Sequence, residues 1–252
     1  MTVAIVTGGS SGIGKSAAIE IARRGAGVIL TYGRNGQGAS EAVATIERAG
    51  GRAVALSLDV GNSESFPAFR DAVSKALKDT WNTDSFTSLV NNAGIARSAL
   101  LENTSEEMFD ELMRVLFKGP YFLTQTLLPL LEDGGAIVNT TSNTALFSGM
   151  EPGYSAYGSM KGGMVVLTQY MAREFSKRGI RVNSVSPGAT RTRLGGDAFA
   201  KYPELIEPIA AKTAFGHVGE PEDIGMVIAA LVSEECRWIT GQNIEASGGY
   251  NM

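Results

Sequence analysis

Short apolar runs rich in β-branched residues alternate along the chain with longer segments in which apolar residues recur every three or four positions. The first pattern predicts buried parallel strands, and the second predicts helices that each bury one face. Six helical segments are expected between seven strands. The strands are expected at residues 3–7, 27–32, 53–58, 86–90, 136–141, 181–186 and 242–246. This alternation predicts an α/β fold with a doubly wound parallel sheet of seven strands and helices on both faces.

Two long segments add features to this pattern. The longest helix is expected over residues 105–131 and contains Gly119-Pro120, which predicts a kink because proline cannot donate a main-chain hydrogen bond. Its broad apolar surface favours contact with a partner subunit as well as with the sheet. Residues 194–219 are rich in Gly, Ala and Pro, so an irregular lid over a site is expected there. No boundary interrupts the pattern, and residues 1–252 are expected to form a single domain.

Composition excludes several classes of function. The net charge of −4 argues against a nucleic-acid partner, which a basic face would bind. No apolar run approaches the ~18 residues of a membrane span. Cys236 and His217 are the only residues of their kinds, so a disulfide, a zinc site or a histidine-based triad is not expected. The lone cysteine favours a reducing compartment, and we expect a cytoplasmic protein without a metal.

The first expected strand runs into a glycine-rich turn that is followed by a helix. Glycines allow the main chain to approach a pyrophosphate closely, and the helix N-terminus offers free N–H groups and partial positive charge. This context predicts a dinucleotide site, although a plain strand–helix turn remains the alternative. The residues expected to contact the cofactor here are Thr7, Gly8, Ser10, Ser11, Gly12, Ile13 and Gly14.

The next two strand ends bear on the choice of cofactor. Residues 31–34 contain no carboxylate that would bind the ribose 2′-OH of NAD. Arg34 is able to pair with a 2′-phosphate, so NADP(H) is favoured while NAD(H) stays possible, and the alternative for Arg34 is a solvated loop cation. Asp59, followed by Val60, is placed either to accept a hydrogen bond from an adenine amine or to cap a turn.

Polar and small residues also follow the later strands, where ligands bind in doubly wound sheets. The fourth strand ends in Asn91-Asn92-Ala93-Gly94, and Ser142 follows the fifth. The sixth runs into a segment that holds Pro187, Gly188, Thr190 and Thr192.

Tyr157 and Lys161 are four residues apart in an expected helix, so they share one face of it. A cation near a phenol favours its ionised form, and such a pair can exchange a proton near neutral pH. Tyr154 competes for this role but has no lysine four residues on. We therefore expect Tyr154, with Phe147, to line the substrate pocket.

Taken in order, these motifs resemble the short-chain dehydrogenase/reductase family, whose fold is Rossmann-like, and in particular its carbonyl reductases similar to 3-oxoacyl-carrier-protein reductase. The resemblance implies that Tyr157 is the general acid or base and that Lys161 lowers its pKa and binds the nicotinamide ribose. It further implies that Ser142 binds the substrate carbonyl, that Asn91 and Gly94 lie at the adenosine ribose, and that Thr192 reaches the nicotinamide half. A homotetramer is also implied.

Three positions depart from the family pattern. Leu116 occupies the place of an Asn that the family implies to hold a water molecule behind Lys161, and leucine has no hydrogen-bonding group. Ser142 precedes Tyr157 by 15 residues, about two more than is usual, with the extra length in residues 147–152. Ser11 stands where many NADP-dependent members carry a basic residue.

The function expected from the sequence is hydride transfer between NADP(H) and a ketone or secondary alcohol. One alternative is a 3-oxoacyl thioester reductase with Arg97, Arg191 and Arg193 at its entrance. Because of Leu116, a catalytically impaired cofactor-binding regulatory protein is an alternative of another class.

Overall fold

The computed structural model describes residues 2–252, and its centre is a parallel sheet of seven strands in the order β3-β2-β1-β4-β5-β6-β7. The strands are β1 (Val3–Val6), β2 (Gly27–Tyr32), β3 (Ala53–Ser57), β4 (Phe86–Asn91), β5 (Leu131–Thr140), β6 (Arg181–Pro187) and β7 (Asn243–Ala246). Every neighbouring pair is parallel. The predicted α/β class and strand number are confirmed.

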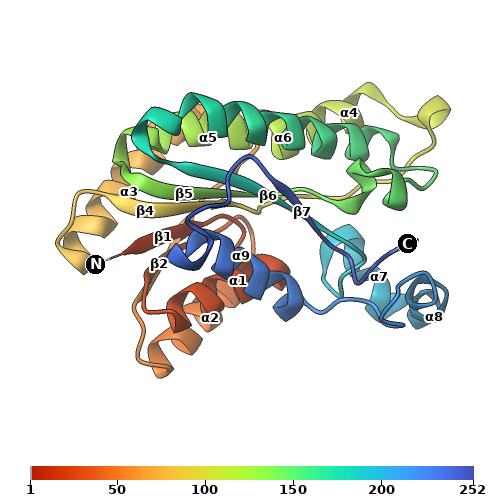
Figure 1. The fold of residues 1–252 in the computed structure, drawn as a ribbon, viewed down its shortest axis with the longest axis horizontal. Coiled ribbons are helices and arrows are strands. Elements are labelled where there is room, and N and C mark those ends of the chain that lie inside the picture. Colours follow the sequence, from red (N-terminus) through yellow and green to blue (C-terminus); the bar gives the residue numbers. More distant parts are fainter. Residues whose placement is uncertain (1) are drawn as a thin grey trace.

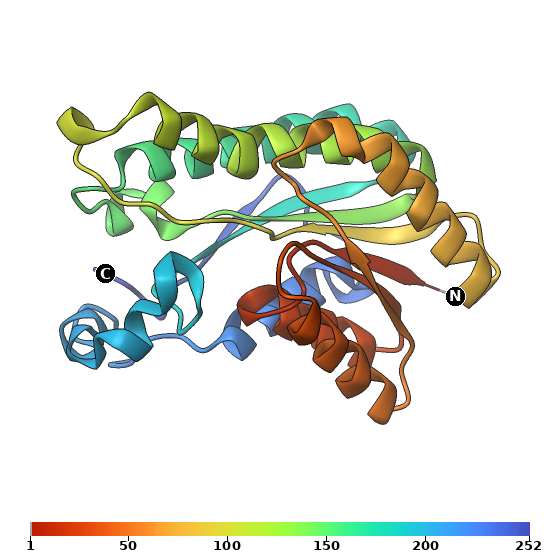
Figure 2. The same ribbon diagram turned by 180° about the vertical axis from the view of Figure 1, so that it is seen from behind.

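Helices cover both faces of the sheet (Figures 1 and 2). One layer consists of α1 (Gly12–Arg23), α2 (Gly36–Arg48) and α9 (Pro221–Val232). The other consists of α3 (Phe66–Trp81), α4 (Glu106–Met113), α5 (Gly119–Leu127) and α6 (Ser155–Glu174). Each layer buries its own apolar cluster, which is what the periodic apolar positions of these segments require.

The long helix differs from the expectation at its middle. A π-helical segment, Arg114–Lys118, joins α4 to α5 and directly precedes Gly119-Pro120. Pro120 lies in the first turn of α5, where the absence of an N–H is tolerated, so the irregularity falls before the proline. Such π segments inside helices are frequent at functional sites.

Residues 194–219 are less irregular than expected, since they hold two short helices, α7 (Leu194–Lys201) and α8 (Ile206–Ala210). The prediction was wrong because α7 contains Gly195, Gly196 and Asp197 with positive φ angles of 72°, 84° and 64°. Left-handed residues interrupt the helical period that would reveal α7 in the sequence.

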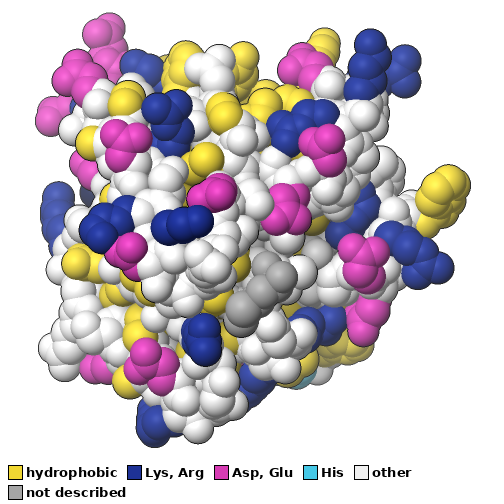
Figure 3. All heavy atoms as spheres, turned by 90° about the vertical axis from the view of Figure 1, so that its left-hand side faces the viewer, with side chains coloured by type: hydrophobic (Ala, Val, Ile, Leu, Met, Phe, Trp, Pro, Cys, Tyr) yellow, Lys and Arg dark blue, Asp and Glu magenta, His cyan; other side chains and the backbone are white. Residues whose placement is uncertain are grey.

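The two ends of the sheet differ in character. At the amino ends of the strands, the surface carries positive and negative side chains interspersed with apolar ones (Figure 3). The motifs identified above gather at the opposite, carboxyl ends. Within residues 2–252, no helix is long and apolar enough to cross a lipid bilayer.

Candidate active site

The glycine turn between β1 and α1 forms the floor of one half of the site. A Cβ atom on Gly14 would lie 2.4 Å from the Gly8 carbonyl oxygen and from Asn92 Nδ2, so only glycine fits there. Ser11 is the N-cap of α1, yet its side chain makes no capping hydrogen bond, and the first turn has no acidic residue. The helix N-terminus is therefore open to an anion such as a pyrophosphate.

Thr7 connects this turn to the end of β4. Its buried hydroxyl donates to the Val90 carbonyl oxygen at 3.2 Å and accepts from the N–H groups of Asn92 at 2.8 Å and Ala93 at 2.9 Å. The side chain of Thr7 thus positions two motifs relative to each other, and its polar atoms are engaged within the protein. The Asn92 side chain also joins the end of β4 to the glycine turn, because its amide donates to the Thr7 carbonyl oxygen at 2.9 Å.

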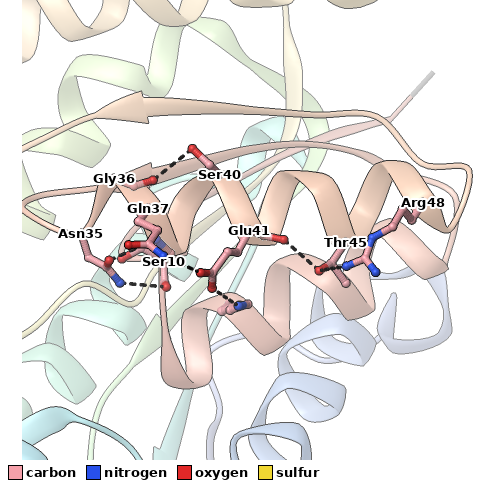
Figure 4. A network of polar contacts seen from close by, with 10 residues as sticks. Ser10, Asn35, Gly36, Gln37, Ser40, Glu41, Thr45 and Arg48 are labelled. Carbon is pink, nitrogen blue, oxygen red and sulfur yellow. Dashed lines mark hydrogen bonds and ion pairs between the residues drawn. The ribbon is translucent and has the colours of Figure 1, made fainter.

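A polar groove of about 490 Å³ runs beside the glycine turn toward α2. The Asn35 amide donates to the Ser10 carbonyl oxygen at 3.3 Å, and its oxygen accepts from the Gly38 N–H at 3.1 Å (Figure 4). Lys15 also lines the groove, 3.6 Å from the Glu41 carboxylate. Lys15 and Asn35 were not predicted from the sequence, because only folding brings α1 next to the turn after β2.

Asn91 lies at the end of β4, where it was expected, but its side chain points into the protein. The buried amide donates to Thr124 Oγ1 at 3.0 Å and to Asn139 Oδ1 at 2.9 Å. Asn139 in turn donates to Thr168 Oγ1 at 2.9 Å. Both amide hydrogens of Asn91 are engaged within the protein, and its buried Oδ1 has no partner within residues 2–252.

Residues 188–192, which follow β6, bring Thr192 against the glycine turn. A Cβ atom on Gly12 would lie 3.2 Å from Thr192 Cγ2, and Thr192 also lines the groove. Gly188 donates its N–H to the Ala246 carbonyl oxygen at 3.0 Å, and the Thr190 hydroxyl donates to the Gly188 carbonyl oxygen at 2.9 Å. Pro187 ends β6 itself. These residues come together as the strand-end motif predicts.

Other predicted cofactor residues have structural partners of their own. Asp59 is exposed, and its carboxylate accepts from the Gly61 N–H at 2.9 Å, which is the turn-capping alternative. Val60 and Ile13 pack into the two apolar clusters. Arg34 lies exposed after β2.

Ser142 begins a short helical turn after β5, and its hydroxyl is held as an acceptor. It receives hydrogen bonds from the Thr144 N–H at 3.2 Å and from the Thr144 hydroxyl at 2.9 Å. The Ser142 hydroxyl therefore keeps its own proton to donate, either to Tyr157, whose pKa this hydrogen bond lowers, or to a substrate oxygen. The sequence offers no signal for Thr144, because a hydroxyl two residues away in a loop has many possible uses.

Tyr157 lies in the first turn of α6, only 7% exposed. Its ring contacts that of Tyr154 edge to face, with 6.2 Å between the centroids. Tyr154 is 36% exposed, so the ring that contacts buried Tyr157 is itself partly in solvent. Phe147, the other predicted pocket residue, is 93% exposed, so its place in a substrate pocket stays a prediction.

Lys161 lies one turn after Tyr157 and is buried. Its ammonium donates to the Thr140 carbonyl oxygen at 2.7 Å and lies 5.8 Å from the centroid of the Tyr157 ring. A Cβ atom on Gly94 would lie 3.2 Å from Leu116 Cδ2 and 3.9 Å from Lys161 Nζ. Leu116 and the Lys161 ammonium thus both lie close to Gly94, and Leu116 belongs to an apolar cluster that includes Tyr157.

Burial governs the protonation of both groups. It raises the pKa of Tyr157 to about 12, the Ser142 hydroxyl acts in the opposite direction, and Tyr154 adds to the rise. Desolvation lowers the pKa of Lys161 from 10.5 to about 8. The family resemblance implies a lowered phenol pKa, whereas in this structure the loss of hydration outweighs the hydrogen bond with Ser142 and the pKa is raised.

The arrangement fits a dinucleotide better than a metal. The glycine turn cannot accept side chains, the N-terminus of α1 is open, and the buried Thr140 hydroxyl has no partner within residues 2–252. In the same residues, no group of three His, Cys, Asp or Glu side chains gathers as metal ligands.

Residues 8–251 match the family model described as enoyl-(acyl carrier protein) reductase. Versicolorin reductase 1 of Dothistroma septosporum is 33% identical over 258 residues, which cover 98% of this chain and 95% of that protein. The chain belongs to the short-chain dehydrogenase/reductase family. It is an NAD(P)-dependent oxidoreductase, as the family resemblance predicts.

Solved structures of this family share the whole fold. LugOII, a promiscuous reductase that catalyses keto-reduction at C1 during lugdunomycin biosynthesis, is 37% identical with a TM-score of 0.94, covering 100% of this chain and 98% of its own. The angucycline C-6 ketoreductase LanV, solved with bound NADP, is 36% identical with a TM-score of 0.93, covering 99% and 95%.

Proposed function

We propose that the chain reduces a ketone to a secondary alcohol with NADPH, and that Ser142, Tyr157 and Lys161 carry the proton chemistry. The observation that carries the proposal is the convergence of these three side chains at the carboxyl end of β5, next to an open glycine turn. Ketoreductases among the relatives support the reaction class.

The roles follow from the hydrogen bonds of each group. The Ser142 hydroxyl oxygen is occupied as an acceptor, so its proton is directed to the substrate oxygen and stabilises negative charge there. Tyr157, whose raised pKa keeps it protonated, donates its proton to the forming alkoxide. Lys161 holds its ammonium 5.8 Å from the centroid of the Tyr157 ring and would replenish the phenol proton. When bound, the nicotinamide supplies the hydride.

NADP(H) is the proposed cofactor. Support comes from LanV, which binds NADP, and from the absence of a carboxylate at the end of β2. Lys15 lines the groove and would pair with a 2′-phosphate there, next to the N-terminus of α2, and the exposed Arg34 precedes Asn35, which lines the same groove. Lys15 would have to exchange its ion pair with Glu41 for one with the phosphate.

A large apolar or aromatic ketone is the proposed substrate class. Exposed apolar side chains follow the carboxyl ends of β4, β5 and β6, at Leu101, Phe147, Met150, Leu194 and Tyr202. Such a rim would cover a flat ring system. LanV has been solved with rabelomycin, and LugOII acts in lugdunomycin biosynthesis.

A 3-oxoacyl thioester is the second candidate, favoured by the family model's description. Two of the arginines expected at its entrance are already paired, Arg97 with Glu111 at 3.2 Å and Arg191 with Glu220 at 2.8 Å. These carboxylates weaken the attraction for a phosphopantetheine arm. Rates on a free β-keto ester and on its carrier-bound form distinguish the candidates.

We further propose a homotetramer located in the cytoplasm. Support for association comes from exposed apolar side chains on the outer side of α4, α5 and α6. The residues are Phe109, Met113, Tyr121, Phe122, Val166 and Tyr170. The free thiol of Cys236 is consistent with a reducing compartment.

The test of the proposed function is a panel of ketones with NADPH and NADH, followed by the loss of nicotinamide absorbance. Tyr157→Phe is expected to lower kcat by at least about a hundredfold, which is the usual contribution of a general acid, while NADPH binding stays within about twofold. Near-normal turnover by this variant would overturn the assigned mechanism.

A further inference from the structure

Three segments around the substrate side of the site meet at one carboxylate. Glu151 lies in the loop over residues 147–152, which is the part that is longer than usual for the family. Lys212 follows α8 at the end of the lid, and Tyr250 is near the C-terminus. These residues are 61 and 99 positions away from Glu151 along the chain.

The contacts between them converge on a single oxygen. Lys212 Nζ donates to Glu151 Oε1 at 2.6 Å, and the Tyr250 hydroxyl donates to the same atom at 3.3 Å. The ammonium also lies 5.8 Å from the centroid of the Tyr250 ring, within the range of a cation–π contact. Tyr250 is 6% exposed, so the Lys212 ammonium packs against a buried ring.

Main-chain bonds join the same segments. Ala214 and Phe215 donate their N–H groups to the carbonyl oxygens of Gly249 and Gly248, at 3.1 and 3.2 Å. Asn251 donates its N–H to the Lys212 carbonyl oxygen at 2.8 Å. Its side-chain amide donates to the Ser148 carbonyl oxygen at 2.7 Å. The C-terminal residues therefore lie between the lid and the loop, and both views show the C-terminus beside α7 and α8 (Figures 1 and 2).

The loop over residues 147–152 leads directly into α6, the helix that carries Tyr157. Tyr154 follows Glu151 by three residues and contacts Tyr157. On the other side, the Gly153 carbonyl oxygen accepts from the Ala99 N–H at 2.9 Å. A displacement of Glu151 would thus change the position of Tyr154 relative to the lid.

We propose that Glu151, Lys212 and Tyr250 form a clamp that sets the width of the substrate pocket by holding the lid to the loop over residues 147–152. The three are positioning residues, and the proposal rests on the proposed ketoreductase function. An exposed ion pair alone contributes little. Here the shared oxygen and the main-chain bonds make the lid, the loop and the C-terminus move together.

The test compares Lys212→Met, Glu151→Gln and Tyr250→Phe with the reversed pair Glu151→Lys/Lys212→Glu. Hydrogen exchange is expected to rise in both residues 147–153 and residues 194–211 for Lys212→Met and Glu151→Gln, and to return toward wild type in the reversed pair. Since an exposed pair changes binding by only a small factor, KM for the best bulky ketone of the panel is expected to rise about two- to fivefold with kcat nearly unchanged.

Lys201→Met is the matched control, because Lys201 lies in the same lid and, within residues 2–252, forms no ion pair. It should leave exchange in residues 147–153 and KM unchanged. Changes confined to the mutated segment, or a reversed pair no better than the single variants, would overturn the clamp. Exchange is measured without substrate, so the clamp is tested even if no ketone is turned over, which is the outcome that contradicts the proposed function.

Discussion

At the scale of single residues, Lys161 is charged at pH 7 although its burial favours the neutral amine. Replacement by methionine should stabilise the cofactor-free protein at pH 7. A pKa lowered from 10.5 to about 8 corresponds to about 3 kcal/mol at most, and the lost bond to Thr140 reduces the expected gain to about 1–3 kcal/mol. The measurement is the free energy of unfolding in urea for both proteins.

The dependence on pH has a defined sign. Below about pH 8, Lys161 is charged in both states and its burial costs the folded protein the most. Between about pH 8 and 10.5 only the unfolded state retains the proton, so wild-type stability rises with pH and the advantage of Lys161→Met shrinks. Tyr157 is present in both proteins, so its burial contributes to the stability of each. The exposed Lys177→Met is the control, and an advantage independent of pH contradicts the interpretation.

At the scale of elements, the π-helical segment Arg114–Lys118 places Leu116 next to Gly94, which also lies close to the Lys161 ammonium. Leu116→Asn should raise kcat for ketone reduction several-fold, because an amide there can hold water that supplies protons to the lysine. It should also destabilise the protein by about 2–4 kcal/mol through the loss of a buried side chain and the burial of a polar one.

Leu112→Asn is the matched control for this element. Leu112 is as buried as Leu116, lies four residues earlier, and belongs to the same apolar cluster with Tyr157. It should cost similar stability without a gain in rate. If both variants change kcat alike, the effect comes from loosened packing and not from a proton path.

At the scale of the whole molecule, the proposed association would use the exposed apolar side chains on the outer side of α5 and α6. Tyr170→Glu should shift the protein to a smaller species in sedimentation velocity, because a charge would be buried in the interface. Tyr170 is 63% exposed, so the protomer itself should remain folded. Ser40→Glu, on α2 in the other helix layer, should leave the oligomer unchanged, and a monomeric wild-type protein would refute the proposal.

The sequence by itself determined the order of strands and helices, the glycine turn and the identities of Ser142, Tyr157 and Lys161. These features follow from local periodicity and short spacings, which do not depend on distant parts of the chain. They were sufficient to predict the sheet, the family and the NAD(P)-dependent chemistry.

Only the tertiary structure decided what surrounds those groups. The pKa of Tyr157 rises because burial removes its hydration, and α7 is hidden in the sequence by left-handed residues. The bonds from Thr144 to Ser142 and from Tyr250 to Glu151 depend on how the folded chain aligns its loops. A contact between residues 99 positions apart leaves no periodic signal, so the shape of the substrate pocket was not predictable from the sequence.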